Sequence, residues 1–254
     1  MDNAGVSDPT QRFTIRAEDY ERHRPRYPAA LADALFDGFE LKPGEVVADV
    51  GAGTGIFTEV LLQRGCRVVA VEPNAAMRAS LGRLQAAWPA LDVVAGAAEA
   101  TTLPAASVDA VVCVQAFHWF DPARARREFE RIVGGPHRTA LAWNVRDKAA
   151  TPFLRDYDRW LIEHAPEYQR MMQGPVDLPV LEAFFAPQGF EARSFPHAVT
   201  FDWPGLEGLV RSTSYVPAPG DAAFAPMIAA LRGVFDAHQR DGVVTMHYAT
   251  RLFF

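Results

Sequence analysis

A glycine-rich segment between two predicted strands carries the first residues that could do chemistry. Gly51, Gly53 and Gly55 follow the apolar run Val46–Val50, and Glu72 ends the next apolar run about 20 residues after the first glycine. Glycine lets the backbone turn tightly and approach a ligand without a Cβ clash, and a carboxylate at the end of the second strand can accept both hydroxyls of a ribose. The pattern therefore predicts a site for an adenosine-containing ligand.

The glycine spacing separates two classes of such ligands. A dinucleotide fingerprint has a glycine three residues after Gly53, but Ile56 stands there, and its β-branched side chain removes the close approach that a pyrophosphate needs. The observed G-x-G-x-G resembles motif I of the class I S-adenosylmethionine-dependent methyltransferases. This resemblance implies S-adenosyl-L-methionine as the cofactor. The residues expected to hold it in this region are Asp49, Gly51, Ala52, Gly53, Gly55, Glu72 and Pro73.

Residues 20–28 read Y-x-x-x-R-P-x-Y-P. They resemble a segment of the methyltransferase type 11 subgroup that includes trans-aconitate methyltransferase-like proteins, in which the segment closes over the cofactor. The resemblance implies that Tyr20 covers the methionine part and that Arg24 offers its fork of donors to the cofactor carboxylate. The alternative is that Arg24 is a solvated charge and that the prolines only end a helix.

A Gly-Ala-Ala-Glu segment at residues 96–99 matches the family segment that meets the adenine edge. The resemblance implies that the backbone N–H of Ala98 donates to the adenine ring and that Glu99 lies near the pocket. The subgroup usually has a polar residue where Ala97 stands in this chain. Glu99 could instead only cap a helix.

The string Q-A-F-H-W-F-D at residues 115–121 resembles the most specific signature of the subgroup. In this fold the end of the fourth strand faces the transferable methyl group, so the resemblance implies catalytic positions for Gln115, His118 and Trp119. It also implies that Gln115 contacts the cofactor. The ordinary pKa of histidine, near 6.5, would suit a base for a hydroxyl or amine acceptor, whereas a carboxylate acceptor needs none. The alternative for His118 is a hydrogen-bonded core histidine.

Short apolar segments alternate with helical patterns over the first half of the chain. This alternation indicates a parallel sheet covered by helices on both faces, which binds its ligand at the carboxyl ends of the strands. We expect strands over residues 46–50, 67–72, 91–95, 108–115 and 137–144. We expect helices over residues 29–39, 55–63, 75–87 and 122–133.

The second half of the chain continues this fold differently. Apolar residues at helical spacing predict a helix over 221–239, and alternating residues predict a strand pair over 197–203 and 245–254. These two strands correspond to the antiparallel strands six and seven of the family. The predicted fold class is α/β, a doubly wound Rossmann-like seven-stranded sheet.

The predicted organisation is a disordered tail at residues 1–12 followed by a single methyltransferase domain at 13–254. The alternation lapses after the fifth strand, and in the family an insertion there commonly caps the substrate pocket. We therefore expect a helical cap insertion at about 150–195. The segments Trp143-Asn144 and 211–215 match family positions that line the cavity, although both could be ordinary packing residues.

Composition narrows the choice of partners. The chain of 254 residues is 49% apolar, with a net charge of −6 and no long run of Lys or Arg, so we expect a small-molecule acceptor and no nucleic acid. Cys66 and Cys113 lie in or beside apolar strand segments and indicate neither a disulfide nor a metal site. Because no signal peptide or membrane-length apolar stretch is present, we expect a cytoplasmic protein that binds no membrane.

The most favoured function is methyl transfer from S-adenosyl-L-methionine to a small-molecule carboxylate, hydroxyl or amine. Two alternatives stay open. The chain could bind S-adenosyl-L-methionine without methyl transfer, or use a modified form of it. A dinucleotide-dependent oxidoreductase is less favoured, because the third fingerprint glycine is missing.

Overall fold

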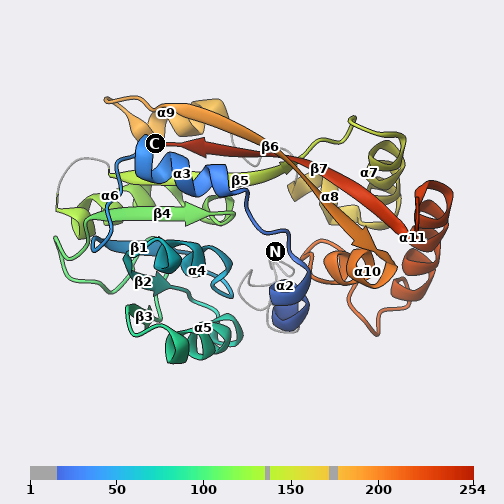
Figure 1. The fold of residues 1–254 in the computed structure, drawn as a ribbon, viewed down its shortest axis with the longest axis horizontal. Coiled ribbons are helices and arrows are strands. Elements are labelled where there is room, and N and C mark those ends of the chain that lie inside the picture. The colour runs from blue at the N-terminus through green and yellow to red at the C-terminus, as the bar shows by residue number, and fades with distance from the viewer. Residues whose placement is uncertain (1–15, 135–137, 172–176) are drawn as a thin grey trace, which may run out of the picture.

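The computed structural model of the protein describes residues 16–134, 138–171 and 177–254. Seven strands form one sheet in the order β3-β2-β1-β4-β5-β7-β6 (Figure 1). The strands are β1 (Val46–Val50), β2 (Arg67–Val71), β3 (Leu91–Val94), β4 (Ala110–Val114), β5 (Thr139–Arg146), β6 (Ala192–Asp202) and β7 (Val243–Phe253). Strand β7 runs antiparallel to β5 and β6, and the other pairs are parallel. The doubly wound seven-stranded fold predicted from the sequence is confirmed.

Helices connect and cover these strands. They are α2 (Ala17–His23), α3 (Ala29–Asp37), α4 (Ile56–Gln63), α5 (Ala75–Ala87), α6 (Pro122–Val133), α7 (Pro152–His164), α8 (Pro166–Met171), α9 (Leu178–Phe185), α10 (Trp203–Arg211) and α11 (Phe224–His238). Local sequence explains several of their ends. Asn74 and Asp121 cap α5 and α6 by accepting from backbone N–H groups at 3.0 Å, and the left-handed Gly134 ends α6.

Successive residues of β1 face opposite sides of the sheet. Val47 packs into a cluster with residues of α3, α4 and α5, whereas Ala48 packs into a second cluster with residues of α6 and α9. This period of two is what an extended strand buried on both faces requires. The two clusters fix the carboxyl ends of β1 and β4 at the point where the strand order reverses, which is the usual ligand site of such sheets.

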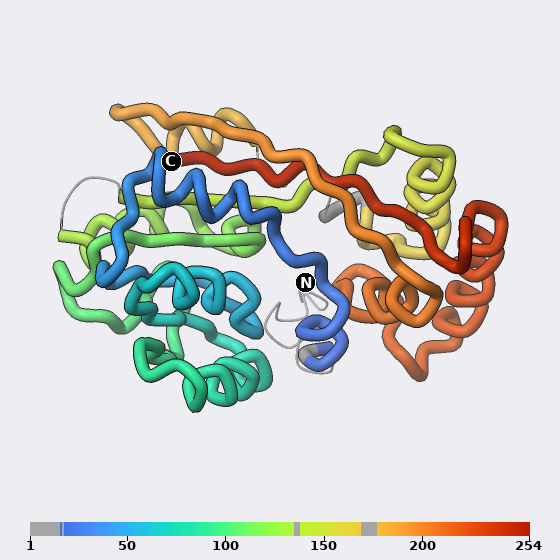
Figure 2. Tube along the Cα trace, in the orientation of Figure 1, coloured from blue at the N-terminus to red at the C-terminus, as the bar shows by residue number. Residues whose placement is uncertain are grey.

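A third hydrophobic cluster lies beyond the sheet's parallel half. It joins α7, α8, α10 and α11 to the far ends of β6 and β7. Within it the indole Nε1 of Trp160 donates to the carbonyl of Met227 at 3.1 Å, which ties α7 to α11. Figures 1 and 2 show β6 and β7 running side by side from the sheet into this group of helices, which we call the cap.

The cap differs in extent from the insertion expected at 150–195. Helix α9 belongs to that segment, but it packs on the sheet, where Leu181, Phe184 and Phe185 share a cluster with residues of α6. Helices α10 and α11 lie outside the segment and join the cap. The sequence indicated each amphipathic helix but not its partner, because the direction of the chain between helices decides which apolar face each one covers.

Element bounds agree with the predictions to within a few residues for most elements. Strand β5 runs two residues further than expected, to Arg146, because it continues to pair with β7, and β6 begins earlier, at Ala192, for the same reason. Strand β4 begins at Ala110 instead of residue 108. The tail at 1–12 and the expected strand start at 137 lie outside the described residues.

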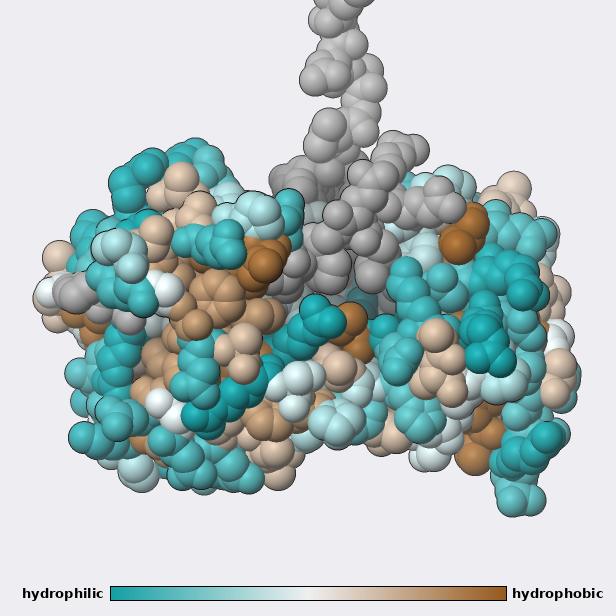
Figure 3. Space-filling view, turned by 90° about the horizontal axis from the view of Figure 1, so that it is seen from above, coloured by the Kyte–Doolittle hydropathy of each residue, from teal (hydrophilic) through white to brown (hydrophobic). Residues whose placement is uncertain are grey.

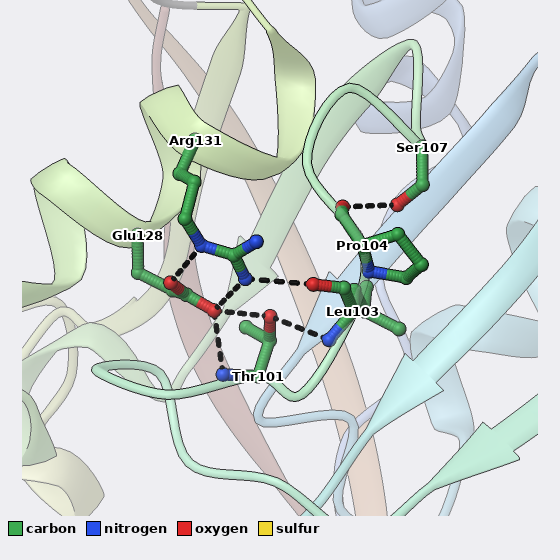
Figure 4. A network of polar contacts seen from close by, with 6 residues as sticks. All are labelled: Thr101, Leu103, Pro104, Ser107, Glu128 and Arg131. Carbon is green, nitrogen blue, oxygen red and sulfur yellow. Dashed lines mark hydrogen bonds and ion pairs between the residues drawn. The ribbon is translucent and has the colours of Figure 1, made fainter.

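A polar network fastens α6 to the loop that follows β3 (Figure 4). The Glu128 carboxylate accepts from the backbone N–H of Thr101 at 2.8 Å and from the Thr101 hydroxyl, and it pairs with Arg131 at 2.7 Å. Arg131 also donates to the carbonyl of Leu103 at 2.7 Å. These bonds satisfy buried backbone groups that would otherwise be costly to remove from water.

The two halves of the molecule also differ in the surface that they present in one view. Seen from above, hydrophobic residues gather in the left part of the picture, the side on which α9 and the C-terminus lie in Figure 1, whereas hydrophilic residues predominate on the right (Figure 3). Within the described ranges, no helix combines the length and apolar character that crossing a bilayer requires.

Candidate functional site

The glycine loop leaves the carboxyl end of β1 at the reversal of strand order. Gly51, Gly53 and Gly55 have φ angles of 74°, 60° and 91°, a left-handed region that favours glycine. The backbone N–H groups of Gly51 and Ala52 donate to the carbonyl of Val71 at 2.9 and 3.3 Å. A Cβ at Gly51 would lie 2.4 Å from the Cβ of Ala116, whereas a Cβ at Gly53 would meet no described atom within 4 Å. The loop is thus packed at its first glycine and open at its second.

The acid at the end of β2 faces this loop. Glu72 is 7% exposed and accepts from the backbone N–H of Gly53 at 2.9 Å and of Asn74 at 2.8 Å, one donor on each oxygen. Burial raises the pKa of Glu72, although both backbone donors and the charge of Arg78 oppose the shift. The next residue, Pro73, is exposed, and its carbonyl accepts from Arg78 at 2.6 Å.

Asp49 takes a different place from the other predicted cofactor residues. It is 1% exposed and accepts from the Thr58 hydroxyl at 2.6 Å, which joins β1 to α4 beneath the glycine loop. Burial raises the pKa of this carboxyl to about 7, the Thr58 bond opposes the shift, and the charge of Glu72 adds to it. Asp49 is not among the described residues that line the cavity between the sheet and the cap. The hydrogen bond between Asp49 and Thr58 therefore holds together the strand before the glycine loop and the helix after it.

The chain turns sharply after β4. Gln115 has a φ of 61°, which is unusual for a residue with a side chain, and its amide Nε2 donates to the carbonyl of Asn144 at 3.3 Å. A short 3-10 turn over Phe117–Trp119 follows, in which the rings of His118 and Trp119 lie 5.0 Å apart. The side chains of Gln115, His118 and Trp119 all line the same cavity.

His118 lies at the cavity wall with its side chain exposed. Surrounding protein, and after it the charge of Arg24, lower the pKa of His118 from 6.5 to about 4. Both causes disfavour the imidazolium. The imidazole is therefore neutral at pH 7 and is a weaker base than an unperturbed histidine.

The residues predicted to meet adenine lie on the loop after β3. Ala98 is buried, and the carboxylate of Glu99 accepts from the backbone N–H of Asp121 at 2.7 Å. Glu99 thereby ties this loop to the start of α6. Neither residue lines the cavity between the sheet and the cap, so the adenine contact stays a prediction.

A cavity of about 200 Å³ opens between the sheet and the cap. Of the residues predicted for the site, it is lined by Tyr20, Arg24, Gln115, His118 and Trp119. Its remaining described walls are Pro25, Tyr27, Ile56, Trp143, Asn144, Val145, Arg146, Tyr157, Tyr168, Leu209, Thr213, Ser214, Tyr215 and Tyr248. Segments far apart in the chain therefore converge on one space, including Trp143-Asn144 and part of 211–215.

Helix α2 brings Tyr20 and Arg24 to this cavity by packing against α10. The guanidinium carbon of Arg24 lies 4.7 Å from the centroid of the Tyr20 ring, and its Nη2 donates to the carbonyl of Ser212 at 3.2 Å. The Arg24 Nε is buried and has no acceptor in the described part of the chain. Arg24 thus retains a donor for a ligand.

Several wall residues were not predicted from the sequence, chiefly Arg146, Tyr157, Tyr168 and Tyr248. Strand alternation offered one signal, because Arg146 stands two residues after Asn144 and so faces the same side of β5. The tyrosines carried no such signal. Three different elements supply them, and only packing brings these elements together.

The described residues contain no group of three or more His, Cys, Asp or Glu side chains that could hold a metal ion. Cys66 and Cys113 are both buried and free. The polar groups of the site are a carboxylate at the glycine loop and arginine, histidine, amide, phenol, hydroxyl and indole groups around the cavity.

Part of the chain is similar in sequence to known proteins. Residues 48–135 match a family model described as a methyltransferase domain. The chain is 44% identical over 129 residues to an uncharacterized methyltransferase of Mycobacterium tuberculosis, covering 51% of this chain and 50% of the relative. It is 35% identical over 136 residues to an uncharacterized methyltransferase-like protein of Schizosaccharomyces pombe, covering 53% and 52%. The chain thus spans about half the length of the curated relatives it matches.

Solved structures extend the similarity of the fold. One from Anaeromyxobacter dehalogenans, described as a type II methyltransferase, has a TM-score of 0.60 at 24% identity, covering 91% of this chain and 96% of its own. Phosphoethanolamine N-methyltransferase 2 of Haemonchus contortus, solved in complex with S-adenosyl-L-methionine, has a TM-score of 0.55 at 15% identity, covering 100% and 60%.

Proposed function

We propose that this chain, which contains a methyltransferase domain over residues 48–135 on the class I methyltransferase fold, is an enzyme. It transfers a methyl group from S-adenosyl-L-methionine to a small-molecule acceptor. When bound, this cofactor supplies a methyl group on a positively charged sulfur. The protein must hold it, orient an acceptor toward the methyl group and exclude competing water.

The observation that carries the proposal is the pairing of Glu72 with the open glycine loop. Each Glu72 oxygen takes one backbone donor and retains acceptor capacity for a further one, as two ribose hydroxyls would require. Beside it, the space that a Cβ would occupy at Gly53 is empty of described atoms. A buried carboxylate with spare acceptors next to an open backbone fits the ribose end of the cofactor.

Two residues that line the cavity suit the other end of the cofactor, its methionine part. The Nε of Arg24, which has no acceptor among the described residues, suits the methionine carboxylate, and an arginine fork binds carboxylates through two parallel hydrogen bonds. The ring of Tyr20, next to Arg24, gives this end an aromatic wall. Aromatic faces also attract a cationic sulfur by roughly 0.5 to 2 kcal/mol.

Chemistry at this site depends mainly on alignment. Holding two reactants in line can remove on the order of 7 to 11 kcal/mol of a barrier, and methyl transfer needs no fixed catalytic triad. Gln115, His118 and Trp119 line the cavity at the end of β4, where they can orient an acceptor. A neutral His118 can accept or donate one hydrogen bond to that acceptor.

Calorimetry followed by a product search tests the proposal. We expect the protein to bind both S-adenosyl-L-methionine and S-adenosylhomocysteine. Incubation with S-adenosyl-L-methionine and a metabolite extract should yield a product heavier by one methylene, detected by mass spectrometry. Cofactor binding without any methylated product would favour a binding protein that transfers no methyl group, and absence of binding would refute both functions.

A further inference from the structure

The charges around the cavity do not balance. Arg24 and Arg146 are the charged residues among its described walls, and no aspartate or glutamate is among them. Behind the wall, the carboxylate of Asp158 lies 3.4 Å from Arg146 and 3.4 Å from Lys148, so one acid faces two cations. The Tyr168 hydroxyl also donates to Asp158. The cap end of the cavity therefore carries an excess of positive charge.

Arg146 has a donor to spare. Its Nη2 donates to the Tyr168 hydroxyl at 2.7 Å, but its Nε is buried and has no acceptor within the described ranges. An unpaired donor of a charged group is costly to bury, and such groups in folded proteins usually meet a partner. The Nη2 also donates to Asp158 at 3.4 Å, so Nε is the donor left for a ligand. A ligand oxyanion would supply that partner, because a guanidinium N–H donates a strong, charge-assisted hydrogen bond to an oxyanion.

Tyrosine rings fix the position of this arginine. The guanidinium carbon of Arg146 lies 4.8 Å from the ring centroid of Tyr157 and 5.8 Å from that of Tyr168. These two aromatic faces are therefore already occupied by a protein cation and are not available to a cationic ligand. Burial raises the pKa of Tyr157 and Tyr168 far above the ordinary value, so both phenols stay protonated. This end of the cavity disfavours a cation and suits an anion.

The two arginines lie on different walls, Arg24 at the end of α2 and Arg146 at the end of β5. Under the proposed function, on which this inference rests, the carboxylate of the cofactor satisfies Arg24. That leaves Arg146 for the acceptor. We propose that the methyl acceptor carries an oxyanion, a carboxylate or a phosphate, which binds to Arg146 at the cap end of the cavity.

Binding of simple anions tests this without knowledge of the acceptor. The wild-type protein is saturated with S-adenosylhomocysteine, which occupies the cofactor end, and is titrated with acetate and with inorganic phosphate at constant ionic strength. We expect binding of at least one anion in wild type, and a dissociation constant about tenfold or more higher in Arg146→Met, because a charge-assisted hydrogen bond is lost. The anion that binds more tightly distinguishes a carboxylate from a phosphate.

Arg232→Met is the matched control. Arg232 pairs with Asp236 at 2.9 Å on the outside of α11, so this variant changes the net charge equally without touching the cavity. Its anion affinity should equal that of wild type. Equal affinity in Arg146→Met as well, or no anion binding by the wild-type complex, overturns the inference.

Two further measurements distinguish failure of the acceptor assignment from failure of the proposed function. If Arg146→Met does not fold, Arg146→Lys keeps the positive charge beside Asp158 but lacks the Nε donor, and unchanged anion affinity in this variant also overturns the inference. Failure of wild type to bind S-adenosylhomocysteine refutes the proposed function itself. Normal S-adenosylhomocysteine binding with no effect of Arg146 refutes only the acceptor assignment.

Discussion

Glu72 is the residue whose role can be tested with least disturbance of the backbone. Glu72→Gln retains an acceptor oxygen for one of its two buried backbone donors but removes the charge that strengthens bonds from ribose hydroxyls. Because a hydrogen bond to a charged group contributes about 1.5 to 3 kcal/mol, we expect S-adenosylhomocysteine affinity to fall about tenfold or more, measured by calorimetry. Asp92→Asn, an exposed change of the same kind on β3, should leave the affinity unaltered. Unchanged affinity in Glu72→Gln would remove Glu72 from the cofactor site.

His118 can be tested as a base or as a positioning residue. Its lowered pKa keeps the imidazole neutral at pH 7 but makes it a weak base, and an oxyanionic nucleophile would need no base. We therefore expect His118→Ala to raise KM and to leave kcat within about threefold, since the lost contact is made equally in the ground and transition states.

The pH dependence of kcat tests the alternative role of His118, that of a general base. A base with a pKa of about 4 would produce a kcat that rises with pH well below pH 6.5, because the neutral imidazole forms as the proton leaves. Loss of that limb in His118→Ala, together with a fall in kcat of roughly 10²-fold or more, would assign His118 as a general base.

At the scale of elements, a glycine of the glycine loop can be compared with a glycine outside it, because both have positive φ angles. Gly53 and Gly44 both have left-handed φ angles, 60° and 91°, and both have open space where a Cβ would stand. A valine at either position costs roughly 1 to 3 kcal/mol of backbone strain. Only Gly53→Val also fills the space beside Glu72, so we expect it to abolish S-adenosylhomocysteine binding in calorimetry while Gly44→Val retains it. Equal binding by both variants would place the cofactor elsewhere.

The link between α6 and the loop after β3 predicts a loss of stability in acid. Hydrogen bonds from Arg131 chiefly, and also from Thr101, lower the pKa of Glu128 to about 2, below that of an unfolded glutamate near 4.5. A lowered native pKa stabilises the fold above pH 4.5, and this contribution disappears as pH falls toward 2. Denaturant unfolding should therefore show a smaller drop in stability between pH 5 and pH 3 for Glu128→Gln than for wild type. An identical drop in both proteins would contradict this role.

At the scale of the whole molecule, the sheet and the cap share β6 and β7, each of which runs through both. We predict that they unfold together as a single domain. Leu231→Ala, which empties a fully buried position in the cap, should cost about 2 to 5 kcal/mol and shift one common transition in far-ultraviolet circular dichroism and tryptophan fluorescence. Ile162→Ala, on the exposed face of α7, should change stability little. Separate transitions for the two probes would contradict a single domain.

The sequence by itself determined the parallel half of the sheet and the positions of the glycine loop and of Glu72 at the ends of its strands. The apolar run Val46–Val50, the glycine loop and Glu72 are local features, because consecutive residues set their conformations and a strand buried on both faces reads as continuous apolar sequence. The Gln115 to Asp121 string likewise indicated its place at the end of β4. For such segments, propensity and topology leave few alternatives.

Only the tertiary structure decided which residues surround the cavity. Arg146 looks in the sequence like any charged residue after a strand, and Tyr157, Tyr168 and Tyr248 look like core aromatics of three separate elements. Their meeting depends on β5 continuing to pair with β7 and on α7 and α8 folding over that extension. The same packing left the Nε of Arg146 without a partner among the described residues. The surroundings of His118, and after them the charge of Arg24, lowered the pKa of that histidine. Burial and long-range contacts create these properties, and no short stretch of sequence encodes them.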